Sequence, residues 1–73
     1  MDLFDRATEE RDGLLDKITK LKNFIGSDEY NNLNKFDQED LNIQLHAMEI
    51  YLVSLERRIE REYNRRNAVK TLE

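Results

Sequence analysis

The second half of the chain carries a regular stripe of apolar residues. Its members recur at alternating steps of four and three residues, a spacing that places them on one face of an α-helix: Leu41, Leu45, Met48, Leu52, Leu55 and Ile59. A shorter stripe of the same kind precedes it, at Leu14, Ile18, Leu21 and Ile25. The pattern therefore predicts an all-α fold in which two amphipathic helices pack as an antiparallel hairpin.

The first helix is predicted over residues 3–25. Gly13 lies inside it, and a glycine in a helix costs about 1 kcal/mol relative to alanine. We therefore expect a bend or break near Gly13 that separates a short N-terminal helical arm from the rest of the helix. Gly26 is typical of a helix C-terminus, and Ser27 is typical of the N-cap of one further helical turn.

The second long helix is predicted over residues 35–67. Asn34 is a suitable N-cap, and Asp37 stands at the third helical position, as in a capping box. The hairpin thus forms a single domain over residues 1–67. Residues 68–73 are predicted to be a frayed C-terminal tail. The stretch of the long helix beyond Ile59 is expected to overhang its partner.

A chain of 73 residues leaves room for little more than these two helices. Folding costs about 1.5 kcal/mol of conformational entropy per ordered residue, so a lone hairpin is marginally stable. The chain has no cysteine and a single histidine, which exclude a disulfide and make a structural zinc site improbable. We therefore expect the hairpins to assemble as a compact homo-oligomer.

Charge narrows the possible partners. The net charge of −4 argues against general binding to DNA or RNA, which normally needs a basic surface. No segment approaches the roughly 18 consecutive apolar residues of a membrane span, and the acidic N-terminus does not resemble a secretory signal. Of the 16 acidic residues, 11 lie in residues 1–40, whereas five arginines gather late in the long helix: Arg57, Arg58, Arg61, Arg65 and Arg66.

Catalytic patterns are missing from the sequence. The only histidine, His46, is interpreted as a half-exposed helix residue rather than a catalytic base. There is no glycine-rich phosphate loop and no calcium-binding loop. We therefore predict a protein that is not an enzyme and that uses no metal or cofactor.

Two basic clusters are candidates for binding an anion. The first is Lys17 with Lys20 and Lys22, with the hydroxyl of Thr19 nearby. The second is the arginine run that begins at Arg57. Lysine offers a point charge to phosphate, and arginine offers a planar pair of donors that can also stack on a base. Either cluster alone is also compatible with an ordinary solvated helix face.

A longer pattern runs through residues 6–59 in three segments: Arg6-x-x-x-Glu10-x-x-x-Leu14-x-x-Lys17-Ile18-x-x-Leu21-x-x-Phe24-Ile25, then Tyr30-x-x-Leu33, then Asp40-Leu41-x-x-Gln44-Leu45-x-Ala47-Met48-x-x-Tyr51-x-x-x-Leu55-x-x-Arg58-Ile59. Its most specific parts are the block Gln44-Leu45-x-Ala47-Met48-x-x-Tyr51 and the distance of this block from Lys17-Ile18. This pattern resembles the hairpin domain of the phage anti-CBASS protein 2 family, which is shared with Thoeris anti-defence sponges.

The resemblance implies a phage immune-evasion protein in the cytoplasm of the infected bacterial host. Such proteins sequester the cyclic oligonucleotide messengers of CBASS immunity without degrading them. They form compact oligomers, typically hexamers, with ligand pockets between protomers. One class of pocket takes cyclic dinucleotides and another takes cyclic trinucleotides.

The resemblance also implies particular site residues. Lys17 corresponds to the lysine that contacts the phosphate of a cyclic dinucleotide. Thr19 and Arg58 correspond to the threonine and arginine of the trinucleotide pocket. The family usually has a tyrosine near the N-terminus for stacking on a base. Here the only ring nearby is Phe4, slightly out of register and without the hydroxyl.

Two other classes of function remain open. In the first, the long stripe is a coiled-coil seam and the arginines contact an acidic protein, so that the chain is a structural or protein-interaction hairpin. In the second, residues 57–66 bind nucleic acid, although this conflicts with the net charge. A ligand that binds only the folded state raises the melting temperature, so a panel of cyclic oligonucleotides distinguishes the first alternative from a sponge.

Overall fold

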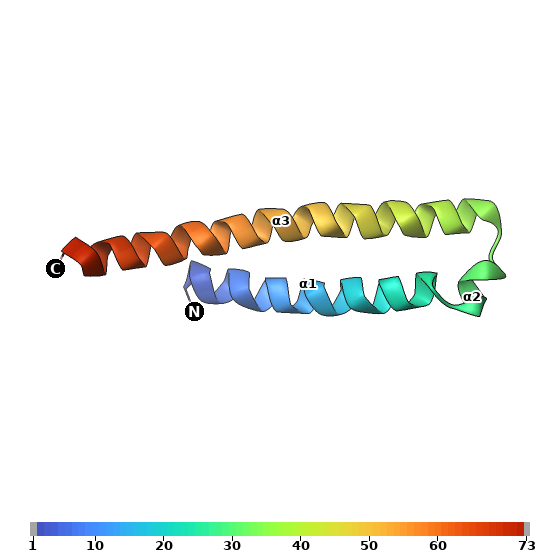
Figure 1. Ribbon diagram of the computed structural model, residues 1–73, viewed down its shortest axis with the longest axis horizontal. Helices are drawn as coiled ribbons and strands as arrows, with labels where there is room; N and C mark the ends of the chain where they lie inside the picture. The colour runs from blue at the N-terminus through green and yellow to red at the C-terminus, as the bar shows by residue number, and fades with distance from the viewer. Residues whose placement is uncertain (1, 73) are drawn as a thin grey trace.

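The computed structural model shows two long helices lying side by side, joined at one end by a helical turn (Figure 1). It describes residues 2–72, with side chains over residues 2–67. Helix α1 spans Leu3–Ile25, α2 spans Asp28–Asn31 and α3 spans Lys35–Leu72. The molecule is a rod with Cα extents of 60 × 17 × 16 Å. The predicted all-α antiparallel hairpin is confirmed.

Helix α1 is continuous, so the predicted break at Gly13 and the separate N-terminal arm are wrong. Asp2 caps the helix by accepting a hydrogen bond from the backbone N–H of Asp5 at 2.9 Å. Gly13 has no positive φ, and the next residue, Leu14, is buried in the core. Packing of Leu14 on α3 anchors the helix at this point and outweighs the cost of about 1 kcal/mol for a helical glycine.

The connection between the long helices follows the predicted caps. The N–H of Gly26 closes α1 by donating to the carbonyl of Lys22 at 3.1 Å, and the Ser27 hydroxyl accepts from the N–H of Tyr30 at 3.3 Å. Asn34 accepts a hydrogen bond from the N–H of Asp37 at 2.8 Å. The Asp37 carboxylate in turn accepts from the Asn34 side-chain amide at 3.0 Å, which differs from the backbone contact of a capping box.

The core is small and lies in the middle of the hairpin. Leu14 and Ile18 of α1 and Leu55 of α3 are buried, and Leu55 is fully buried. Leu45, Met48 and Leu52 pack against them and are partly exposed. These are residues of the two predicted stripes. A core of three buried side chains leaves much apolar surface uncovered in a single chain.

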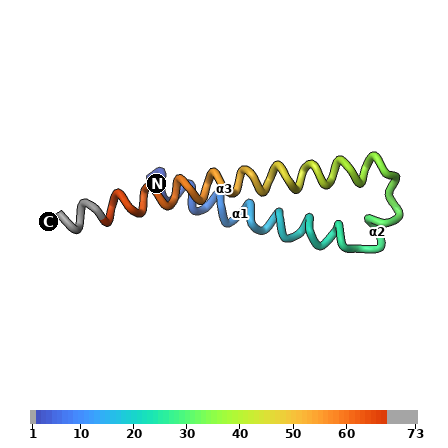
Figure 2. The backbone as a smooth tube through the Cα atoms, turned by 45° about the horizontal axis from the view of Figure 1, so that its top comes forward, coloured from blue at the N-terminus to red at the C-terminus, as the bar shows by residue number. Residues whose placement is uncertain are grey.

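The two helices remain paired further along α3 than predicted. Near the turn, Nζ of Lys22 lies 3.8 Å from Oε2 of Glu49. At the other end of the hairpin, Nη2 of Arg66 lies 2.6 Å from Oδ2 of Asp2. Figure 2 shows the start of α1 beside the orange part of α3. The stretch immediately after Ile59 is therefore not an overhang, because the first turns of α1 lie against it.

Helix α3 continues to Leu72, past the predicted end at residue 67. The sequence predicts a frayed tail over residues 68–73. The side chains of residues 68–72 and the whole of residue 73 lie outside the described part of the chain. That prediction, and the domain limit at residue 67, stay predictions. Over the described residues, no helix combines the length and the apolar character needed to cross a membrane.

Candidate anion-binding groove

The first turns of α1 and the late turns of α3 enclose an open groove of about 380 Å³, within the size range of small-molecule sites. We call it the arginine groove. Its walls carry four arginines, two glutamates and one aromatic ring: Arg6, Arg58, Arg61, Arg65, Glu10, Glu62 and Phe4.

The arginine groove is locally basic on an acidic protein. Arg65 pairs with Glu62 at 2.9 Å, but neither Arg6 nor Arg61 lies within ion-pair distance of a carboxylate among the described side chains. Each of the two long helices thus contributes a guanidinium group that no described carboxylate pairs with. Planar guanidinium donors match the oxygens of phosphate, so the chemistry of the groove favours a phosphorylated ligand.

Arg58 lies next to a hydrogen bond that joins the two helices. The Tyr51 hydroxyl donates to the carboxylate of Glu10 across the hairpin. This hydrogen bond raises the pKa of Tyr51 above its usual value; desolvation adds to the shift, and the Arg58 guanidinium opposes it. The Glu10–Tyr51 contact therefore joins α1 to α3, and Arg58 interacts with the same tyrosine hydroxyl.

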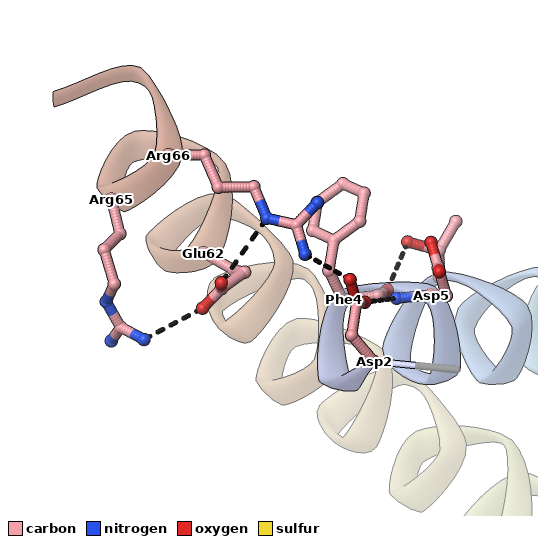
Figure 3. Close-up of polar contacts among 7 residues, drawn as sticks. Asp2, Phe4, Asp5, Glu62, Arg65 and Arg66 are labelled. Atoms are coloured by element: carbon pink, nitrogen blue, oxygen red, sulfur yellow. Dashed lines mark hydrogen bonds and ion pairs between the residues drawn. The ribbon is translucent and has the colours of Figure 1, made fainter. Parts of the chain in front are cut away.

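The aromatic ring at the mouth of the groove already has a cation over it. The Arg66 guanidinium lies 4.7 Å from the centre of the Phe4 ring (Figure 3). Two ion pairs hold Arg66 in this position. Its Nη2 lies 2.6 Å from Oδ2 of Asp2, and its Nε lies 3.5 Å from Oε1 of Glu62. The Asp5 backbone N–H and, next, Arg66 lower the pKa of the Asp2 carboxyl. One face of Phe4 is therefore covered by Arg66 in the free chain.

The four residues indicated by the resemblance do not meet within one protomer. Phe4 and Arg58 line the arginine groove, whereas Lys17 and Thr19 are exposed further along α1. The Thr19 hydroxyl donates to the carbonyl of Leu15 at 2.9 Å. With 1.5 Å of rise per residue, Thr19 lies about 13 Å along α1 from Glu10, which lines the groove together with Arg58. Thr19 is therefore outside the arginine groove of its own protomer.

Five charged residues of the groove were not predicted as site residues. Arg6 and Glu10 entered only as positions of the family pattern, Arg61 and Arg65 only as members of the arginine run, and Glu62 was not singled out. The signal that could have identified them is the pairing register of the two helices, counted from the turn. Starting from the turn at Gly26 and Ser27, antiparallel pairing brings the beginning of α1 opposite the late arginines of α3.

Taken together, the fold and the groove define a small helical-hairpin protein with an arginine-rich groove between its two long helices. A family model described as Sequestin matches residues 1–61, and the chain belongs to this family, the phage anti-CBASS and anti-Thoeris sponges. The suspected family is thus confirmed. No curated protein and no solved structure matches the chain. Membership of the family makes the chain a sponge-like sequestering protein for small signalling molecules.

Proposed function

We propose that this protein binds and sequesters the cyclic oligonucleotide messengers of bacterial CBASS immunity, in the cytoplasm of the infected host, without degrading them. The observation that supports this most directly is the arginine groove. Two of its guanidinium groups, those of Arg6 and Arg61, have no carboxylate partner among the described side chains, on a chain whose net charge is −4. Sequestration needs tight binding only, which agrees with a site that pairs arginines with an aromatic ring.

The chemistry of the ligand fits this site. A cyclic oligonucleotide carries one phosphodiester per nucleotide and presents flat bases. Arginine can bind a phosphodiester bidentately and can stack on a base. A small anion has few atoms, so high affinity requires enclosure by preorganised groups. The acidic remainder of the surface repels long nucleic acids and so contributes selectivity by exclusion.

Arg58 and Thr19 are proposed to bind cyclic trinucleotides from neighbouring protomers. Their separation along the hairpin supports a pocket between subunits rather than within one. A symmetric assembly, for which we propose the hexamer, repeats each residue once per subunit and matches the repeated phosphates of the ligand.

Lys17 and Phe4 are proposed to bind cyclic dinucleotides, with Lys17 against phosphate and Phe4 against a base. Because Arg66 covers one face of the Phe4 ring, a base must use the opposite face or displace Arg66. For this reason, binding of cyclic trinucleotides is the better supported half of the proposal.

The test is a thermal-shift and calorimetry panel with cyclic triadenylate, cyclic diadenylate and linear triadenylate. We expect at least one cyclic ligand to raise the melting temperature, because a ligand of the folded state stabilises it by mass action. We expect the linear control to bind far more weakly. The ligand released by heating is expected to be chemically unchanged. No shift with any cyclic ligand would instead favour an interaction module, and a degraded ligand would indicate an enzyme.

Variants of the first basic cluster test the proposed division of ligands. We expect Thr19→Val, which keeps the shape of the side chain but removes its hydroxyl, to weaken cyclic triadenylate binding about tenfold, the worth of one hydrogen bond to a charged group. Lys17→Ala is expected to weaken cyclic diadenylate more than cyclic triadenylate. If both variants lost affinity for cyclic diadenylate and cyclic triadenylate equally, the proposal of separate pockets for the two ligands would be contradicted.

A further inference from the structure

The side of α3 that faces away from α1 carries a second apolar stripe. Phe36, Ile43 and Ile50 recur every seven residues and are 76%, 66% and 61% exposed. Ala47 lies between the last two and is also exposed. We call these four residues the outer stripe. A seven-residue repeat keeps side chains on one line of a helix, and α1 covers a different line, which contains Leu55.

Charges of opposite sign flank the two ends of the outer stripe. Glu39 and Asp40 lie between Phe36 and Ile43, whereas Arg57 and Arg61 follow Ile50. All four charged residues are exposed, and none makes an ion pair with another described side chain. At 1.5 Å per residue, Asp40 and Arg57 are about 25 Å apart along the helix. The face therefore has an acidic end, an apolar middle and a basic end.

We propose that the outer stripe binds the outer stripe of a second copy of this chain, with the two α3 helices antiparallel about a two-fold axis. In this arrangement Asp40 of each protomer lies opposite Arg57 of its partner, so the favourable charge pairing occurs twice. A parallel arrangement would place like charges together, which disfavours it.

One register satisfies both the charges and the shapes. When Asp40 lies opposite Arg57 of the partner, Ala47 lies opposite Ile50, Ile43 opposite Ser54, and Phe36 opposite Arg61, which also lines the arginine groove of its own protomer. The small side chain of Ala47 allows the helices to approach closely, and an arginine over a phenylalanine ring is attracted to it. The most exposed ring of the chain thus gains a cation as its neighbour.

The pattern favours a second copy over an unrelated protein. An interface between identical chains about a two-fold axis must be complementary to itself. A face that is acidic at one end and basic at the other meets this condition only when the two helices are antiparallel. The hairpin also has a reason to pair, because only three of its described side chains are buried apolar ones. The inference does not depend on any ligand and extends the proposed function to a specific contact between protomers.

Cysteine cross-linking tests the direction of pairing, and the chain has no cysteine of its own. Asp40→Cys and Arg57→Cys are prepared separately, one of them labelled with ¹⁵N, then refolded together and oxidised at low ionic strength. We expect the mixed disulfide to dominate and each variant alone to give little dimer. Disulfides within each variant alone, or no mixed disulfide, would overturn the proposal. Leu15→Cys of α1, refolded with Arg57→Cys, is the control and is expected not to cross-link.

Charge insertion tests the apolar middle independently. The double substitution of Ile43→Glu and Ile50→Glu is expected to raise the dissociation constant for self-association at least about tenfold in sedimentation equilibrium, without added ligand. Both positions are exposed, so we expect the helicity measured by circular dichroism to be retained. Leu15→Glu is the matched control and is expected to leave the dissociation constant unchanged. An unchanged dissociation constant in the double variant would overturn the proposal.

Discussion

The middle of the hairpin and its N-terminal end are built from different interactions. In the middle, Leu14, Ile18 and Leu55 exclude water and no charged group is buried. At the N-terminal end, where α1 begins beside the late turns of α3, the helices meet through Asp2, Arg66 and the arginine groove, all largely exposed. Burial stabilises far more than exposed charge pairs do. The middle therefore holds the fold, and the N-terminal end is where we propose that the ligand binds.

The strongest test of this comparison removes the centre of the core. Leu55 is fully buried, so Leu55→Ala is expected to lower the free energy of unfolding by about 2–5 kcal/mol, which for so small a domain approaches its whole stability. Urea unfolding followed by circular dichroism measures the loss. Val53→Ala, on an exposed side of the same helix, is the control and is expected to change stability by less than about 0.5 kcal/mol. Similar losses in both variants would mean that the middle does not hold the fold.

At the N-terminal end of the hairpin, we expect a substitution to reduce ligand affinity without reducing stability. Arg58→Ala should weaken cyclic triadenylate at least about tenfold, because a charged donor to phosphate is lost, while the urea midpoint stays close to that of the parent chain. Calorimetry and circular dichroism on the same sample measure both. Lys35→Ala, which removes an exposed positive charge near the turn, is the control and should bind normally. Loss of helicity or assembly in Arg58→Ala would show that Arg58 is structural.

Gly13 offers a gain in stability within α1. A Cβ added at this position meets no atom within 4 Å, and the backbone is helical. Gly13→Ala is therefore expected to raise the free energy of unfolding by about 1 kcal/mol without changing ligand affinity. A higher urea midpoint checks the first expectation and calorimetry the second. A destabilised variant would indicate that α1 needs to bend at Gly13 after all.

The smallest effect is expected at the exposed charge pair between Asp2 and Arg66. The pKa of Asp2 is lowered in the folded chain, so its carboxylate stabilises the fold above its unfolded pKa near 3.8, and this contribution is lost as pH falls through the folded value. Asp2→Asn keeps an N-cap but removes the charge. We expect the parent chain to melt slightly higher than Asp2→Asn at pH 7 in low salt, and the difference to shrink as the pH is lowered from 4 into the range where the folded carboxyl takes up its proton. A difference that does not shrink on acidification would contradict this role for the charge.

The hairpin was predictable from the sequence because its signals are local. Leucine spacing fixed the two buried stripes, and Ser27 and Asn34 marked the caps. The continuity of α1 was not predictable from propensity, since Gly13 argues for a break and only packing of Leu14 on α3 overrides it. The groove was recognised in part. Arg58 and Phe4 followed from the family pattern, but Arg6 and Arg61 depend on the register of two distant segments, which no local pattern encodes.

We propose above that the arginines of this hairpin hold an intact cyclic oligonucleotide. Native mass spectrometry of the full chain with cyclic triadenylate is the decisive experiment, because it records the assembly and the mass of its ligand together. We expect an assembly that carries unmodified cyclic triadenylate, and the same assembly without ligand for Arg58→Ala. An assembly that carries no cyclic oligonucleotide from a panel of cyclic di- and trinucleotides, or one that releases a hydrolysed product, would contradict it.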